Sequence, residues 1–185
     1  MKTIHKMQCL PVDFLPASAR VDFLHLVACD KPAVRTKIIH PEAKLYLEDW
    51  CSRCGFVLRV DSESFVCVSR EARVAEWILS LDQSHEPHEH LLGLLLGYPD
   101  CCSNFVASVG EADIDHMEQE IGQWNFVGDF KRIDPSNYVA GASLICHLPC
   151  SSTCQPSLAI ANQTLKFINL HRNEDCLNHW LSWLS

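Results

Sequence analysis

The sequence predicts an α+β fold, with a small antiparallel sheet in the N-terminal half and a mainly helical C-terminal half that carries a cysteine-rich metal site. Three observations point to it: β-rich runs between residues 44 and 69, apolar residues at helical spacing after residue 71, and cysteines gathered where two predicted helices begin. A length of 185 residues suits one compact unit. Within it we expect a small α+β lobe over residues 1–82 and a helical, metal-binding lobe over residues 83–185.

The N-terminal elements follow from residue type. Residues 1–43 are mixed and contain several prolines, and Val21–Val27 fits either a short strand or a helix. After them, three β-rich runs separated by turn residues predict a three-stranded antiparallel meander. The runs are Leu45–Leu47, Phe56–Val60 and Phe65–Val68.

The remainder of the chain is predicted to be helical. Apolar spacing indicates a helix over residues 71–81, and a short one over 88–96 that stops at Gly97. Further helices are expected over residues 100–109, 112–124 and 154–171. Residues 125–136 fit a loop, 138–146 a strand or buried segment, and 175–184 an apolar closing segment. Trp180 and Trp183 of that closing segment fit a core or a dimer interface.

The composition limits the classes of partner. A formal net charge of −8 disfavours a nucleic-acid backbone or an anionic membrane surface as partner. The apolar run Leu91–Leu96 falls far short of the roughly 20 residues that span a bilayer, and the start of the chain does not read as a signal peptide. An odd count of eleven cysteines excludes complete disulfide pairing. We therefore expect a soluble, cytoplasmic protein with reduced thiols, a small-molecule substrate, no nucleic-acid or membrane partner, and a homodimer as a candidate assembly.

Two predicted helix starts bring cysteines into chemically similar positions. Asp100 fits an N-cap, which places Cys101 and Cys102 at the first helical positions. Pro156 must lie in the first turn of the later helix, because its missing N–H is tolerated only there. Ser152 as N-cap with Gln155 would then form a capping box. That arrangement puts Cys150 in the entry loop and Cys154 in the first turn.

These positions favour thiolates and hence a metal. Free N–H groups and the helix dipole lower a cysteine pKa at a helix start. We expect Cys101 or Cys102, together with Cys150 and Cys154, to bind one inorganic centre, with His147 as an extra ligand or donor. Because Cys101 and Cys102 point about 100° apart on a helix, only one is expected to ligate, and either choice is open. Sulfur ligands suit an iron–sulfur cluster, with 4Fe-4S favoured, or zinc as the alternative.

The same residues resemble an uncharacterised prokaryotic family. Its first motif, LLGYPxCC followed by Phe, is similar to Leu94–Cys102 and Phe105. Its second motif, HxPCSxxCxxS, is similar to the segment from His147 to Ser157. The resemblance covers roughly residues 85–165 and implies that the two motifs share one site. It implies no reaction, since the function of that family is unknown, and Cys146 lies outside the pattern.

Three functions remain open from the sequence. The first is an iron–sulfur enzyme that uses Cys101 and His147 catalytically and performs redox, Lewis-acid or sulfur-transfer chemistry on a small molecule. The second is a zinc-stabilised binding or scaffold module. The third is a metal-free cysteine-nucleophile enzyme, for example Cys150 paired with His147, which would need a third, orienting group.

Some further cysteines and histidines have two readings each. Cys51 and Cys54 have zinc-knuckle spacing but lack a second pair, so a tight turn with two incidental thiols is equally compatible. The isolated thiols fit buried apolar positions; they are Cys9, Cys29, Cys67 and Cys176. A histidine group before the short helix fits a polar linker with capping roles better than a metal site; its members are His85, His88 and His90.

Overall fold

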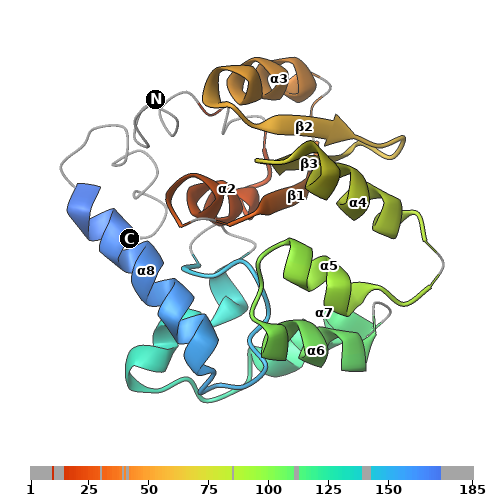
Figure 1. The fold of residues 1–185 in the computed structure, drawn as a ribbon. Coiled ribbons are helices and arrows are strands. Elements are labelled where there is room, and N and C mark those ends of the chain that lie inside the picture. Colours follow the sequence, from red (N-terminus) through yellow and green to blue (C-terminus); the bar gives the residue numbers. More distant parts are fainter. Residues whose placement is uncertain are drawn as a thin grey trace.

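The fold is α+β, as predicted, with a three-stranded antiparallel sheet at one end and helices α5–α8 at the other (Figure 1). The structure is a computed structural model. It describes residues 10, 15–29, 31–38, 40, 42–84, 86–110, 113–138 and 143–171 of the 185-residue chain. The predictions for Cys9, His85, Cys176 and the closing segment 175–184 with Trp180 and Trp183 fall outside the described residues.

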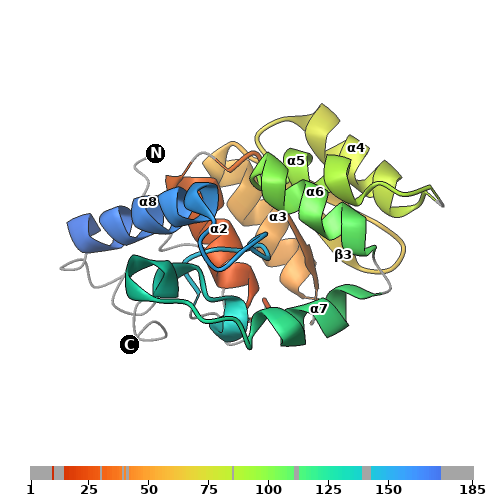
Figure 2. The ribbon, with the colours of Figure 1, turned by 90° about the horizontal axis from the view of Figure 1, so that it is seen from below.

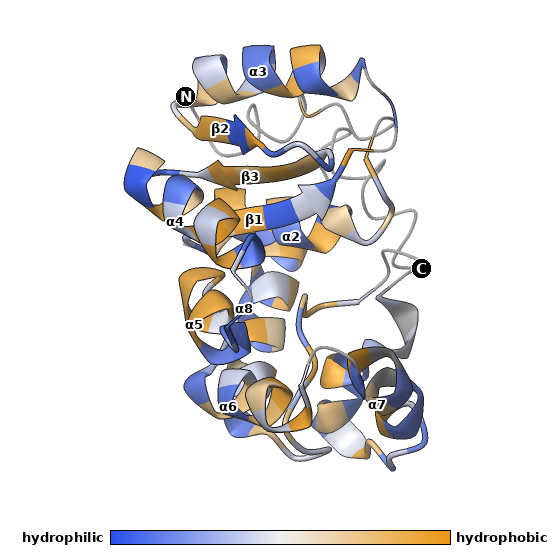
Figure 3. Ribbon diagram, turned by 90° about the vertical axis from the view of Figure 1, so that its right-hand side faces the viewer, coloured by the Kyte–Doolittle hydropathy of each residue, from blue (hydrophilic) through white to orange (hydrophobic). Residues whose placement is uncertain are grey.

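The sheet has the order β1-β3-β2, with β1 at Ala33–Lys37, β2 at Val57–Val60 and β3 at Phe65–Ser69. β3 pairs antiparallel with both neighbours, so that Val68 lies opposite Val34 on one side and Leu58 on the other. Because it is central, β3 is the most buried strand, and Figure 3 shows it as mainly apolar. The predicted meander was therefore right in its last two strands and wrong in its first.

The run at Leu45–Leu47 belongs to a helix, α3 (Ala43–Cys54). Its buried residues recur at helical spacing, and they are Ala43, Leu47, Trp50, Cys51 and Cys54. Leu45, which lies between two of these buried positions, is 68 % exposed. The longer helical period outweighs the β preference of three residues. Gly55, at φ +72°, ends the helix in the left-handed conformation.

Helix α2 (Ala19–Ala28) resolves the ambiguity at Val21–Val27 in favour of a helix, and it is buried along most of its length. It packs beside β1 and α8. The core between α2, α3 and the sheet includes Trp50, whose ring packs edge-on to Phe23 at 5.6 Å and stacks on Phe56 at 5.2 Å. Ile168 of α8 joins this core, so the two ends of the molecule share apolar side chains.

The remaining helices lie close to their predicted bounds. They are α4 (Ala72–Asp82), α5 (Glu89–Leu95), α6 (Asp100–Val109), α7 (Ile114–Ile121) and α8 (Gln155–His171). The predicted loop after α7 contains two short 3-10 helices, η3 (Gly128–Ile133) and η4 (Pro135–Asn137). Residues 143–154 run as irregular chain between α8 and the α5–α6 pair (Figures 1 and 2). Within the described residues, no helix combines the length and apolarity that a membrane span requires.

Candidate metal centre and adjoining cavity

The α5–α6 junction sets the position of the first cysteine pair. Gly97 adopts φ +78° and packs against the Pro32 ring so closely that a Cβ atom would collide with it. Pro99, not Asp100, is the N-cap of α6. The Asp100 carboxylate instead accepts hydrogen bonds from His90 at 2.9 Å and Asn104 at 3.1 Å. The predicted cap was one residue off, and Cys101 and Cys102 still lie in the first turn.

The second cysteine pair lies where α8 begins. The helix starts at Gln155, with Pro156 in its first turn, so the predicted capping box from Ser152 is wrong. Cys154 directly precedes the helix, and its carbonyl accepts the Leu158 amide at 3.0 Å. Cys150 lies in the entry loop, as expected.

These two helix starts bring four sulfur atoms together. The Sγ atoms of Cys101, Cys102, Cys150 and Cys154 all lie within 4.8 Å of one another. Cys154 Sγ is 3.6 Å from Cys102 Sγ and 3.9 Å from Cys101 Sγ. The two adjacent sulfurs, Cys101 and Cys102, are 3.9 Å apart. Both adjacent thiols therefore join the group, although helix geometry predicted only one. A cluster of this composition can bind a metal ion.

Burial and hydrogen bonds shift the pKa values of three of the four thiols. Burial alone would raise the pKa of Cys154, but bonds from the Ser157 hydroxyl and amide and from neighbouring thiols outweigh burial and lower that pKa. Burial raises the pKa of Cys102 well above its usual value, against hydrogen bonds from Ser157 and the Cys150 amide. Burial and neighbouring thiols raise the pKa of Cys150 to about 11. Of these three thiols, Cys154 is therefore the one that most favours the thiolate, which is the form that binds a cation.

His147 lies beside the sulfur group, not within it. Its Nε2 atom is 2.9 Å from the Ser157 hydroxyl, which is 3.2 Å from Cys154 Sγ and 3.3 Å from Cys102 Sγ. The ring packs on Tyr98 with centroids 5.3 Å apart. The predicted pairing of His147 with Cys150 is replaced by this bond to Ser157. His147 is therefore connected to the sulfur group through the Ser157 hydroxyl. Its other nitrogen, Nδ1, is buried and has no hydrogen-bond partner in the part of the chain that the structure describes.

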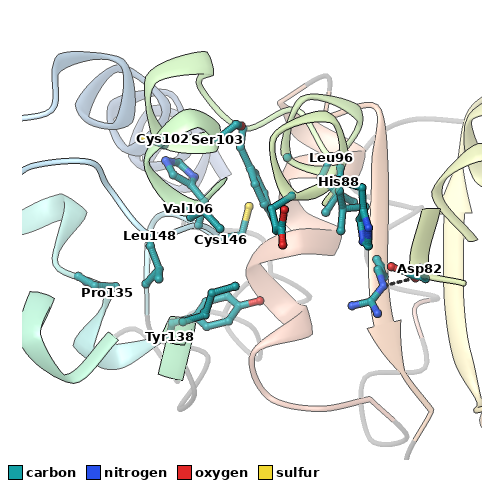
Figure 4. A pocket seen from close by; sticks show the side chains of 17 residues that line it. Asp82, His88, Leu96, Cys102, Ser103, Val106, Pro135, Tyr138, Cys146 and Leu148 are labelled. Carbon is teal, nitrogen blue, oxygen red and sulfur yellow. Dashed lines mark hydrogen bonds and ion pairs between the residues drawn. The ribbon is translucent and has the colours of Figure 1, made fainter. Parts of the chain in front are cut away.

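A cavity of about 320 Å³ adjoins the sulfur group. Figure 4 shows Cys102 and Ser103 of α6 on one side, Tyr138 and Leu148 opposite, and the Cys146 sulfur between them. Gly93 allows α5 to approach α6 here, because a Cβ atom at this position would collide with the Ser103 side chain. A second cavity of about 280 Å³ is lined by Lys31, His25 and Cys29 and shares Cys146, Tyr98 and His147 with the first. Volumes of this size suit small molecules.

A buried polar cluster that the sequence did not lead us to expect adjoins both cavities. Lys31 Nζ is 3.2 Å from the Asp22 carboxylate and 3.3 Å from Cys146 Sγ, and both charged side chains are only 4 % exposed. His25 Nδ1 lies 3.5 Å from the same sulfur. Tyr138 donates to Asp22 at 3.0 Å, and Lys31 lies over the Tyr98 ring at 4.3 Å. A signal was present, since Asp22 and His25 are polar residues three apart in an apolar helix.

The other candidate ligands lie elsewhere. Cys51 and Cys54 are buried residues of α3, so they form part of a helix and not a knuckle turn. Burial and nearby negative charges raise the pKa of Cys51 to about 12. His88 precedes α5 and its Nδ1 lies 2.9 Å from the Glu86 carbonyl, while His90 pairs with Asp100. Both histidines are thus bonded to neighbouring backbone or carboxylate groups.

Comparison with known proteins identifies no relative: no family model, curated protein or solved structure matches the chain. The resemblance to the uncharacterised family therefore stays a prediction. The function of this chain is inferred from the geometry of its cysteine cluster and the adjoining cavities.

Proposed function

We propose that the four clustered cysteines hold a single tetrahedral metal ion, zinc in the first place, and that this ion fixes the wall of a small-molecule site. The observation that carries this proposal is the sulfur spacing. A tetrahedral ion with metal–sulfur bonds of about 2.3 Å holds its sulfurs about 3.8 Å apart. Three of the Sγ separations, at 3.6, 3.9 and 3.9 Å, fall at that value.

The spacing bears directly on the iron–sulfur expectation. In a 4Fe-4S cluster each cysteine binds a different iron, and the irons are separated by sulfides, so the Sγ atoms lie substantially further apart than around one ion. With all pairs within 4.8 Å, the four cysteines would have to move outward to hold such a cluster. The zinc alternative raised from the sequence therefore fits the geometry better than 4Fe-4S.

The surroundings suit a negatively charged tetrathiolate centre. The N-termini of α6 and α8 both lie at the sulfurs and present the positive ends of their dipoles. The Cys150 amide bonds to Cys102 Sγ, and the Ser157 amide and hydroxyl bond to Cys154 Sγ. Such N–H and O–H donors offset excess charge on the sulfurs.

A centre with four protein ligands is closed, which is typical of structural zinc. Its role here would be to join the first turn of α6 to the loop before α8. Cys102 and Ser103 of that turn line the 320 Å³ cavity, so the ion would hold this wall in place. We therefore propose a metal-stabilised protein that binds a small molecule beside, and not on, its metal.

Metal analysis of protein purified without oxygen tests this proposal. We expect a colourless protein with about one zinc ion per chain. Cys150→Ser and Cys154→Ser should each lose most of the zinc, whereas Cys29→Ser, which changes a thiol at the end of α2, should keep it. A brown protein with about four irons and matching sulfide would refute the zinc proposal and show that the cysteines hold an iron–sulfur cluster. A metal-free protein would refute both the zinc site and the cluster.

The pH dependence of zinc binding provides a second test. Cys102 and Cys150 have raised pKa values and are protonated near neutral pH, so zinc must displace at least these two protons. Apparent affinity should therefore rise by a factor of about 100 per pH unit between pH 6 and 8, measured by competition with a chelator. An affinity that does not change over this range would contradict a thiolate site.

A further inference from the structure

Cys146 is placed to meet a ligand. Its side chain lines both cavities, with its sulfur between Tyr138 and the α6 side of the larger one (Figure 4). It lies four residues before the first cysteine of the α8 pair and belongs to a different set of contacts. Lys31 and Asp22 come from the N-terminal half, so this group forms only when the two halves of the chain fold together.

The hydrogen bonds around Cys146 fix the protons. The Thr164 hydroxyl donates to the Ile160 carbonyl, so it accepts from His25 Nε2 at 2.7 Å, and the Leu144 carbonyl accepts from the same nitrogen. The proton of His25 is therefore on Nε2. Burial, together with the charge of Lys31, lowers the pKa of His25 to about 3 and keeps the ring neutral. His25 Nδ1 then faces the thiol as an acceptor.

Lys31 and Asp22 supply the charges that a nucleophilic thiol requires. Burial alone would lower the pKa of Lys31, but Cys146 and Asp22 outweigh it and raise that pKa, so the ammonium beside the sulfur stays charged. Burial raises the pKa of Asp22, against the effects of Lys31, Tyr138 and a hydrogen bond with Cys146. Burial also raises the pKa of Cys146 to about 12, so the resting group is a thiol that needs a base. The thiol has two acceptors beside it, His25 Nδ1 at 3.5 Å and the Asp22 carboxylate. Burial and the charge of Lys31 lower the pKa of His25, whereas burial raises the pKa of Asp22, so the carboxylate is the stronger base of the two.

A second, independent feature points to the ligand. The Ser157 hydroxyl donates to Cys154 Sγ and so accepts from His147 Nε2, which leaves His147 Nδ1 as an unprotonated acceptor. This nitrogen is buried and has no hydrogen-bond partner among the described residues, and His147 lines the same two cavities as Cys146. Buried acceptors are normally satisfied. A ligand that carries an N–H donor would satisfy this one.

We propose that Cys146 is the nucleophile of a hydrolytic site for a small carboxamide, with Asp22 as proton acceptor, Lys31 as the cation that stabilises the developing negative charge, and His147 Nδ1 as acceptor for the substrate N–H. Nucleophile, base and cation within hydrogen-bonding reach are the arrangement that covalent acyl transfer requires. This inference does not depend on which metal the four clustered cysteines hold.

The reaction balances with water as the second reactant. Cys146 Sγ attacks the carbonyl carbon, an S–C bond forms, and the thiol proton passes to Asp22. The C–N bond breaks, and the nitrogen leaves as ammonia or an amine with that proton. Water then attacks the thioester carbon, gives one proton to Asp22 and releases the carboxylic acid. That proton returns to the sulfur, so no oxidant or reductant is consumed.

Alkylation with iodoacetamide, itself a small carboxamide, tests the nucleophile in the metal-loaded protein by peptide mass spectrometry. Cys67 is the matched control: burial raises its pKa to about 12 as well, yet it lies in an apolar cluster with Ala33 and Ile78. We expect Cys146 to be alkylated at least about tenfold faster than Cys67. Equal or slower alkylation of Cys146 would overturn the proposal.

The role of the charged pair is tested in the double variant Asp22→Asn/Lys31→Met, which removes both charges without leaving one buried alone. With folding checked by circular dichroism, we expect Cys146 alkylation to slow by about tenfold and Cys67 alkylation to stay unchanged. Treatment of wild-type protein with 4-nitrophenyl acetate should place an acetyl group on Cys146, and Cys146→Ser should lack the associated release of nitrophenol. An unchanged alkylation rate in the double variant, or acetylation confined to other residues, would refute the assignment.

Discussion

Replacing Lys31 by methionine should destabilise the protein strongly, because it removes one member of a buried ion pair. The Lys31 and Asp22 side chains are each 4 % exposed and 3.2 Å apart. In the variant, the described residues leave Asp22 with polar contacts to Tyr138 and the Cys146 thiol and with no counterion for its charge. Removing one partner of a buried pair costs about 3–5 kcal/mol, mostly because the other charge stays buried. We expect a loss of that size in the free energy of unfolding.

Urea unfolding of the metal-loaded protein near pH 7 measures this loss, read as a change in midpoint at constant slope. The double variant Asp22→Asn/Lys31→Met should recover most of it, to within about 1–2 kcal/mol of wild type, because neither charge remains. Arg59→Met is the matched surface control: Arg59 pairs with Glu76 at 2.8 Å, but both side chains are largely exposed, so its loss should stay below about 1 kcal/mol. A Lys31→Met loss no larger than that of Arg59→Met would refute the reasoning.

Two further predictions concern the Gly97 turn and the neutral state of His25. Gly97→Ala should lower stability by more than Gly55→Ala, because φ is +78° and +72° at the two glycines but only Gly97 lies against Pro32, while the described residues leave the space at Gly55 open; equal losses by urea unfolding would show that the Pro32 contact adds nothing. His25 has a folded pKa of about 3 against an unfolded value near 6.5. Protons therefore favour the unfolded chain as pH falls through that window, by up to about 1.4 kcal/mol per pH unit. His25→Gln should show a shallower fall in urea midpoint between pH 6.5 and 4, and an identical fall would contradict a neutral buried His25.

The helical half of the fold was predictable because its signals are local. The end of α5 requires only a residue that tolerates φ +78°, which is Gly97. Pro156 restricts where α8 can begin, because proline fits only the first turn. The sheet was harder. The three residues Leu45–Leu47 do not by themselves distinguish a strand from a helix. The helix is recognised only from the buried face that continues through Leu47 and Trp50.

The sulfur group was predictable for the same reason, and the buried ion pair was not. Cys101 and Cys154 both lie at helix starts that the sequence marks. Lys31 lies in a short connection between α2 and β1, where a lysine would ordinarily be expected at the surface. Its burial depends on Asp22 and Cys146, and the thiol is 115 residues further along the chain. No local pattern records a contact of that kind.

The α5–α6 junction shows how the two sites are linked. Gly97 packs on Pro32, which directly follows Lys31, and the Tyr98 ring contacts both Lys31 and His147. Cys101, the first of the four clustered cysteines, follows two residues after Pro99. If the metal is held by four protein sulfurs, it has no position left for a substrate. The proposed reaction at the adjoining cavity would then depend on side chains that line it, and among the described residues these include the Cys146 thiol and the Lys31 ammonium 3.3 Å from it. The four-cysteine cluster and the separate Cys146 thiol are thus two consequences of one arrangement, since the turn that places Cys101 and Cys102 also places Tyr98 over Lys31.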